Sequence, residues 1–177
     1  LKALTREGRP SIGPVDAPLT VVTFIDYGCP YCRRSAGPLR ETMLKYQKNV
    51  RFIMRDFPIE DIHPTAFQAA HAARCAFAQG KGWALHDALY TQQEAQSTAD
   101  LERYAAQSGL DMNAYRSCMD KQQFASSIQE DLADGIRAGV QGTPTFFFNG
   151  VRIQGVPASQ PEVFFDKLIQ RFLQQPS

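Results

Sequence analysis

The chain has 177 residues, of which 44% are hydrophobic and 21% charged, and its net charge is +1. These values are typical of a soluble globular protein with one domain, or one domain with an insertion, that is long enough to bury a real core. The near-neutral charge gives no attraction to nucleic acid, and no apolar run approaches the roughly 20 residues needed to cross a bilayer, so we expect neither a nucleic-acid partner nor a membrane span.

Residues 1–18 contain three prolines and two glycines and show no helical or alternating pattern. We therefore predict an N-terminal arm or linker. It either connects to an upstream oligomerisation or anchoring piece or is a trimmed surface tail. Because residue 1 is Leu rather than Met, we expect that an upstream part, such as a signal peptide, was removed.

The first strong pattern is the apolar run Leu19–Ile25, which predicts a buried strand, followed by a helix that begins at the pair Cys29 and Cys32. A cysteine at a helix N-terminus lies near unpaired backbone N–H groups and the positive end of the helix dipole, which stabilise a thiolate. Arg33 and Arg34 add positive charge in the next turn. We therefore expect Cys29 to be the attacking thiolate and Cys32, one turn further in, to be the resolving thiol.

Two other interpretations of this pair are weaker. A zinc site needs four closely spaced ligands, and the chain has neither a second Cys-x-x-Cys nor a His-x-x-x-His motif, so we expect no metal. The other interpretation is a purely structural disulfide between Cys29 and Cys32.

The chain then alternates between strand and helix before its composition changes. Helical spacing continues to Tyr46, with Pro38 expected to kink the helix, and Asn49–Phe57 predicts a second strand. From Pro64 to Gly139 the sequence predicts five short helices, over residues 65–79, 82–93, 99–107, 111–119 and 122–138.

The last part returns to a strand–turn–strand pattern. Two short apolar runs, Thr145–Phe148 and Val151–Ile153, flank Asn149-Gly150, the strongest short-range hairpin signal. Pro144 opens the first of these strands, and its bond to Thr143 is one of the few that can be cis at modest cost. A final helix begins at Pro161.

Three segments together resemble the DsbA-like branch of the thioredoxin superfamily, and the resemblance extends over residues 13–173. They are Phe24–Cys32, Gln79–Trp83 and Gly142–Phe146. The resemblance implies an α/β fold, the thioredoxin fold with an inserted helical subdomain. Residues 19–63 and 140–177 would form the thioredoxin fold, and residues 64–139 the insertion.

The resemblance also implies a function. We expect a thiol–disulfide oxidoreductase that exchanges disulfides with protein substrates through Cys29 and Cys32, without a cofactor. We expect it to act as a disulfide donor in the periplasm or cell envelope, where a membrane redox partner would recycle it. Pro30 and Tyr31 would tune the redox pair, and Thr143 and Pro144 would hold an extended substrate segment. The alternatives are a disulfide isomerase or reductase, a glutathione-dependent reductase like glutaredoxin, and a redox-inactive module that binds peptides as a chaperone.

Two departures from the family pattern bear on these expectations. Thr143, before the proline, is as typical of isomerases and reductases as of the dedicated oxidase, which leaves the direction of electron flow open. Thr23 stands where thioredoxin and the best-known DsbA proteins have a buried acid. Asp26 is the nearest carboxylate, and it is either a proton relay that tunes the redox pair or a strand-end residue bonded to backbone.

The remaining cysteines and histidines lie in the predicted insertion. Similar DsbA-like chains with an extra cysteine pair place it in this region, so we expect a structural disulfide between Cys75 and Cys118. The alternative is two separate buried thiols. A long-range disulfide would favour an oxidising compartment. We expect the three histidines to be structural or at the surface, and His63, beside Pro64, is the one we single out for a possible functional role.

Overall fold

The computed structural model describes residues 2–175, and its centre is a five-stranded sheet in the order β1-β3-β2-β4-β5. The central strand β2 (Leu19–Ile25) is parallel to β3 (Val50–Asp56) and antiparallel to β4 (Thr145–Phe148). The edge strands are β1 (Ser11–Ile12), antiparallel to β3, and β5 (Val151–Gln154), antiparallel to β4.

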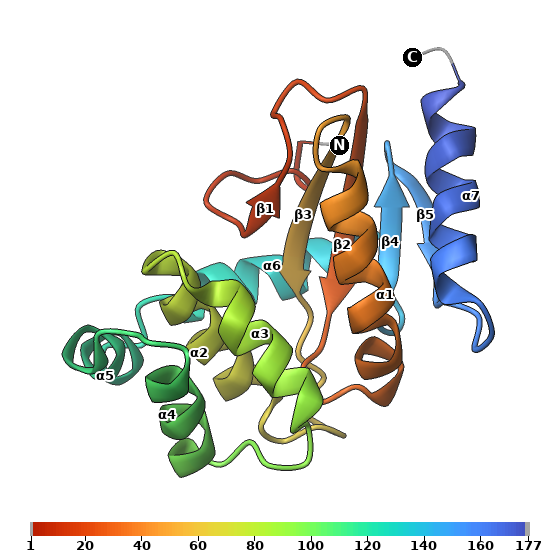
Figure 1. Cartoon of the computed structure of the whole chain (residues 1–177). Helices are drawn as coiled ribbons and strands as arrows, with labels where there is room; N and C mark the ends of the chain where they lie inside the picture. Colours follow the sequence, from red (N-terminus) through yellow and green to blue (C-terminus); the bar gives the residue numbers. More distant parts are fainter. Residues whose placement is uncertain (1, 176–177) are drawn as a thin grey trace.

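Some helices cover the faces of the sheet, and others lie beyond the ends of its strands. The helix α1 (Pro30–Tyr46) packs beside α7 (Pro161–Leu173) on one face of the sheet, and α6 (Ala125–Arg137) packs against β3 on the other. The helices α2 to α6, here called the helical insertion, follow one another between β3 and β4. The bounds of the other four are α2 Ala66–Ala78, α3 Gly82–Thr91, α4 Thr98–Gln107 and α5 Met112–Asp120. Figure 1 shows α2 to α5 gathered beyond the end of β2 and β3, near the first turn of α1.

Alternation along the strands explains how one sheet supports two cores. On β2, Val21 and Ile25 belong to the larger core under α1 and α7, whereas Val22 and Phe24 face the smaller core under α6. Because successive side chains of a strand point to opposite faces, an apolar run is needed when both faces are covered. This is why Leu19–Ile25 is apolar along nearly its whole length, as the sequence predicted for a buried strand.

The smaller core is closed by a near contact between a helix and the sheet. A Cβ atom at Gly135 of α6 would lie 2.7 Å from the ring of Phe57 and 3.1 Å from that of Phe24. Only glycine lets this helix approach the sheet so closely.

The N-terminal arm differs from what its sequence predicts. Instead of an arm without regular structure, it contains β1, which pairs Ser11 with Ile53, and it buries Leu4. Arg6 and Arg9 form ion pairs with Asp134 and Asp131 of α6. A two-residue strand is too short to show alternation, so the sequence pattern could not reveal it.

Two helix boundaries of the insertion differ from the prediction by more than one residue. The helix α6 begins at Ala125, three residues later than predicted, because Gln122 has a φ of 48°, which an α-helix cannot contain. The helix α3 ends at Thr91, so Gln93 lies in the loop that follows it. No helix within residues 2–175 is both long and apolar enough to span a membrane.

Candidate dithiol site

Cys29 is the N-cap residue of α1, and Pro30 occupies the first helical position. A short turn presents it: the Cys29 amide donates to the Asp26 carbonyl at 3.1 Å, and the Cys29 carbonyl accepts from the Arg33 amide at 3.1 Å. Proline suits this position because its missing N–H would have no partner in the first turn of a helix. Cys32 follows one turn later and is also buried, and both cysteines are free thiols here.

The surroundings of the two sulfurs shift their pKa values in opposite directions. A hydrogen bond from the Cys32 side chain is the largest of the causes that lower the pKa of Cys29 to about 5, against an opposing contribution from burial. Once Cys29 is ionised, the hydrogen bonds that the Thr143 side chain and the backbone amides of Cys32 and Tyr31 can donate to its sulfur lower the Cys29 pKa further. At Cys32, burial raises the pKa well above its ordinary value, and the neighbouring Cys29 raises it again. Near neutral pH the reduced site therefore holds one thiolate and one thiol.

Arg33 and Arg34 contribute less than their positions in the sequence suggest. Arg33 pairs with Glu94 at 3.5 Å, and Arg34 donates to the Val156 carbonyl at 3.2 Å and stacks on the Tyr31 ring. Neither is among the main causes of the lowered Cys29 pKa. The thiolate is stabilised chiefly by hydrogen bonds, not by these two charges.

The loop before β4 faces the dithiol. The Thr143–Pro144 peptide bond is cis, and the Cys29 thiol donates to the Thr143 carbonyl at 3.3 Å. The Thr143 hydroxyl is buried and has no hydrogen-bond partner among the described residues. It is therefore free to donate to the thiolate, which cannot itself donate.

A groove of about 800 Å³ leads to Cys29 between the start of α1, the loop after β3 and the cis-proline loop. Its walls are partly apolar: Tyr31 is 61% exposed and Ile62 67% exposed. Other residues that line it are Ile59, His63, Gly142, Thr143, Pro144 and Val156. Exposed apolar side chains beside exposed backbone suit an extended polypeptide segment.

Asp26 is buried at the centre of the loop that carries Cys29. Its Oδ1 accepts from the Gly28 amide at 2.7 Å, and its Oδ2 accepts from the Ile59 amide at 3.0 Å. The same Oδ2 lies 2.7 Å from Nδ1 of His63. Asp26 is therefore a strand-end residue bonded to backbone amides, one of the two interpretations of its sequence position. It also contacts His63, which lines the groove. Thr23 is buried in β2.

Several residues that support this loop were missed by sequence reasoning. The Gln93 side-chain amide donates to the carbonyls of Tyr27 and Cys29, both at 2.9 Å, and Gln96 donates to the Tyr27 carbonyl at 3.0 Å. Tyr90 donates to the Asp26 carbonyl at 3.3 Å. These residues are 64 to 69 positions away from their partners, and no local pattern marks them. The helical insertion therefore holds the backbone that presents Cys29.

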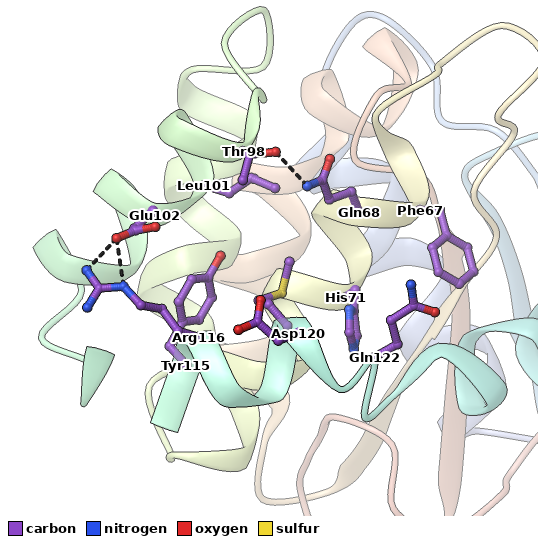
Figure 2. Close-up of a pocket in the computed structure, with 11 residues that line it drawn as sticks. Phe67, Gln68, His71, Thr98, Leu101, Glu102, Tyr115, Arg116, Asp120 and Gln122 are labelled. Atoms are coloured by element: carbon purple, nitrogen blue, oxygen red, sulfur yellow. Dashed lines mark hydrogen bonds and ion pairs between the residues drawn. The ribbon is translucent and has the colours of Figure 1, made fainter. Parts of the chain in front are cut away.

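Cys75 and Cys118 are joined by a disulfide with a Cα–Cα distance of 6.0 Å, and it links α2 to α5. It is not part of the dithiol site. It lies beside a second cavity, of about 370 Å³, between α2, α4 and α5 (Figure 2). The Met119 side chain of this cavity contacts the Cys75 sulfur at 3.8 Å. Glu102 and Arg116 form an ion pair at its wall.

The sulfurs of this disulfide lie close to His71, and the three residues could resemble a metal-ligand cluster. Their donor atoms are already used, however. The sulfurs are bonded to each other, and Nε2 of His71 accepts from the Phe124 amide at 3.1 Å. Because metal-binding cysteines must be free thiolates, the disulfide-bonded protein does not offer a metal site here.

The fold and the dithiol together define a class. They place a Cys-x-x-Cys pair at a helix start, opposite a cis-proline loop and beside an inserted helical layer. A family model described as Thioredoxin matches residues 5–169, so the chain belongs to the thioredoxin family. The resemblance and the thioredoxin fold with inserted helices, both predicted from the sequence, are confirmed.

Solved structures agree with this assignment. A thioredoxin-like oxidoreductase from Silicibacter pomeroyi DSS-3 is 27% identical, with 98% of each chain covered and a TM-score of 0.84. The thiol-disulfide exchange protein alpha-DsbA2 from Wolbachia pipientis is 19% identical and shares the fold, with 96% of this chain and 90% of that one covered and a TM-score of 0.82.

The curated relatives include a much longer protein, the Na(+)/H(+) antiporter NhaA 3 of Salinispora tropica. It is 41% identical over 143 residues, which cover 81% of this chain but 22% of the antiporter. The chain thus spans about a fifth of the length of this relative.

Proposed function

We propose that this chain is a disulfide donor, which oxidises pairs of thiols in protein substrates through Cys29 and Cys32. The observation that carries the proposal is the inequality of the two sulfurs: the pKa of Cys29 is lowered to about 5, while burial raises that of Cys32. A stabilised thiolate favours the reduced form of the pair, and a pair whose reduced form is stabilised is a strong oxidant.

The reaction follows from this inequality. In the oxidised enzyme a substrate thiolate attacks the Cys29 sulfur, the Cys29–Cys32 bond breaks, and Cys32 leaves and takes up a proton. A second substrate thiolate then attacks the substrate sulfur of the mixed disulfide, and Cys29 leaves as a stable thiolate. Two electrons pass from the substrate dithiol to the enzyme dithiol. An oxidant must then remove them, and we propose a membrane redox partner for this step.

The groove suggests how substrates bind. The backbone of Thr143, beside Pro144, would pair with an extended substrate segment, as a strand adds to a sheet edge, while Tyr31 and Ile62 contact its apolar side chains. Pro30 and Tyr31 would tune the pair: proline offers no amide to the sulfur, and the Tyr31 amide is one of the donors that lower the Cys29 pKa.

We place the protein outside the cytoplasm, in the periplasm or cell envelope. The Cys75–Cys118 disulfide supports this location, because long-range disulfides persist mainly in oxidising compartments. The similarity to an antiporter shows that a related segment occurs joined to a membrane protein. This agrees with a role at the envelope.

Three other functions make different predictions. Threonine before the cis-proline is as typical of an isomerase or reductase as of the dedicated oxidase, and such an enzyme would give a lower reduction potential than a donor. A glutaredoxin-like enzyme would depend on glutathione, and the long-range disulfide speaks against its reducing compartment. A redox-inactive chaperone would retain its activity without Cys29, although the lowered pKa of that residue serves no purpose in peptide binding.

The deciding measurement is the reduction potential of the Cys29–Cys32 pair against glutathione. We expect a value between about −120 and about −230 mV, the range from a strong oxidant to a glutaredoxin-like dithiol. A value near that of thioredoxin, about −270 mV, would indicate a reductase and contradict the proposal.

Variants of the two cysteines test the roles assigned to them. We expect Cys29→Ser to abolish disulfide transfer to a reduced dithiol peptide, and Cys32→Ala to accumulate mixed disulfides with it. At pH 6 an alkylating reagent should modify Cys29 before Cys32, because only Cys29 is ionised there. Faster modification of Cys32 would reverse the two roles.

A further inference from the structure

His63 is the one histidine that lines the groove leading to Cys29, and the reaction described above leaves it without a role. Its Nδ1 lies 2.7 Å from Oδ2 of the buried Asp26, and 17% of its side chain is exposed. His63 also packs closely against the backbone of Gly28, because a Cβ atom at Gly28 would lie 2.5 Å from Cβ of His63. Glycine at the position before Cys29 therefore makes room for this histidine beside the nucleophile.

Asp26 fixes which nitrogen of His63 is free. The carboxylate already accepts from the amides of Gly28 and Ile59, and it accepts from His63 only if Nδ1 carries a proton. In a neutral imidazole the other nitrogen, Nε2, is then an unprotonated acceptor. A histidine held by a carboxylate in this way is the usual arrangement of a general base.

The disulfide transfer needs such a base at one particular step. The substrate gives up two protons and two electrons, whereas Cys32 takes up one proton and Cys29 remains a thiolate. The first substrate thiol can ionise in water before it enters the groove. The second must lose its proton while the substrate is covalently held at Cys29, and at neutral pH only a few per cent of an ordinary thiol is ionised.

We propose that His63 is a catalytic general base that deprotonates the second substrate thiol, and that Asp26 is the positioning residue that orients it. The proton passes from the substrate sulfur to Nε2 of His63, and the thiolate attacks the substrate sulfur of the mixed disulfide. The bond from that sulfur to Cys29 breaks, and Cys29 leaves as a thiolate. The imidazolium then returns its proton to water. This step rests on the proposed function.

Other charges near His63 are few and can be tested separately. Cys29 and Arg34 line the same groove, and Arg34 is bound to the Val156 carbonyl and stacked on Tyr31. Within the loop of His63 itself, Glu60 and Asp61 are exposed. Glu60→Gln therefore serves as a control that changes the charge of the loop without touching the contact with Asp26.

The experiment is a single turnover of the oxidised enzyme with a reduced peptide that contains two cysteines, followed by quenched-flow and mass analysis from pH 5.5 to 9.5. In His63→Ala we expect the mixed disulfide to form at the normal rate but to resolve about ten-fold or more slowly at pH 7. The difference should shrink to less than two-fold above about pH 9, where the second thiol ionises without help. Added imidazole should restore part of the rate.

Four further measurements separate catalysis from structure. His63→Gln preserves most of the side-chain volume and should be as slow as His63→Ala, while Glu60→Gln should match the wild type. Asp26→Asn should slow the same step and leave mixed-disulfide formation unchanged. A peptide with one cysteine should form its mixed disulfide at equal rates with all the variants.

The outcomes distinguish this inference from the function on which it rests. If the wild-type enzyme transfers its disulfide and both His63 variants resolve the mixed disulfide at its rate with the same pH profile, the inference is wrong and the proposed function stands. A loss of rate that does not depend on pH, or that imidazole does not relieve, would also overturn it by assigning His63 a structural role. If the wild-type enzyme transfers no disulfide, the proposed function itself fails.

Discussion

Two cysteines separated by two residues differ in their ionisation because the fold places them at different depths. Cys29 receives hydrogen bonds from Cys32, from Thr143 and from the first amides of α1, whereas Cys32 is enclosed by the core and has Cys29 as a neighbour. Spacing and a helix start were enough to predict which sulfur is the thiolate. Arg33 and Arg34 are not among the main causes of the lowered Cys29 pKa, because their guanidinium groups contact Glu94, the Val156 carbonyl and the Tyr31 ring.

The Thr143 hydroxyl offers a direct test of how hydrogen bonds set the Cys29 pKa. We expect Thr143→Val to raise that pKa by about one to two units, since a hydrogen bond to a charged group contributes on the order of 1.5–3 kcal/mol and one pKa unit corresponds to about 1.4 kcal/mol. The measurement is the thiolate absorbance of reduced protein at 240 nm as a function of pH.

A second threonine supplies the control for this prediction. The hydroxyl of Thr23 is also buried without a hydrogen-bond partner among residues 2–175, but it is not among the main causes of the Cys29 pKa. Thr23→Val should therefore leave the titration unchanged. Equal shifts in the two variants would mean that general packing, and not the Thr143 hydroxyl, sets the pKa.

At the scale of elements, the strands and most of the helices could be predicted because each is bounded by glycine, proline or a capping residue. Ser97 and Asp100 form a capping box at α4, and Asp111 caps α5. The parts that could not be predicted depend on long-range contacts. The strand β1 exists only because β3 offers it an edge, and the bonds from Gln93 and Gln96 to the Cys29 loop exist only when the helical insertion has docked.

The disulfide between α2 and α5 should stabilise the helical insertion. The two cysteines are 43 residues apart. In the chain-entropy model, a bridge over such a loop lowers the conformational entropy of the unfolded chain, which stabilises the folded state by on the order of 4 kcal/mol. We expect the double variant Cys75→Ala/Cys118→Ala to unfold in urea with a free energy lower by about 2–4 kcal/mol.

The same variant shows whether this disulfide takes part in the redox reaction. Its Cys29 pKa and its rate of disulfide transfer at 25 °C should equal those of the wild type, because the disulfide lies in a separate part of the fold from the dithiol. An unchanged unfolding free energy would contradict the stabilising role, and a changed transfer rate in folded protein would contradict the separation of the two sites.

At the scale of the whole molecule, a buried network of charges ties the N-terminal arm to the sheet and to the helical insertion. Arg55 of β3 is fully buried and donates to Asp131 at 2.6 Å, to Asp134 at 2.7 Å and to the carbonyls of Ala3 and Leu4. Arg74 of α2 pairs with Asp56 at 2.6 Å and also with Asp131. Arg6 and Arg9 of the arm join this network through Asp134 and Asp131, from which they are 128 and 122 positions away in sequence, so no pattern along the chain predicts these pairs.

The network also makes the free energy of unfolding depend on pH. Hydrogen bonds from Arg6, opposed in part by burial, together with those from Arg55 and Arg137, hold the pKa of Asp134 below its ordinary value. A carboxyl whose pKa is lower in the folded state stabilises the fold above its unfolded pKa and loses that contribution as the pH falls towards the folded pKa. Stability measured in urea should therefore decline below about pH 4.

Asp131 is the residue on which most of this network depends. Its Oδ1 accepts from Arg9 at 2.9 Å and from Arg55, and its Oδ2 accepts from Arg74 and from the Asp56 amide at 3.1 Å. Removing one partner of a buried ion pair leaves an uncompensated charge, which costs about 3–5 kcal/mol. We expect Asp131→Asn to lower the unfolding free energy by that amount in urea titrations at pH 7.

The neighbouring residue gives the matched control. Glu130 pairs with the same Arg9 at 2.9 Å, but its side chain is 49% exposed, and exposed pairs add little to stability. Glu130→Gln should therefore leave the urea midpoint nearly unchanged. Both variants should retain the lowered Cys29 pKa while folded, because neither residue is among its main causes. If the two variants destabilised the protein equally, the arm would be held by surface charge alone, and the buried network would have no special role in joining it to the sheet.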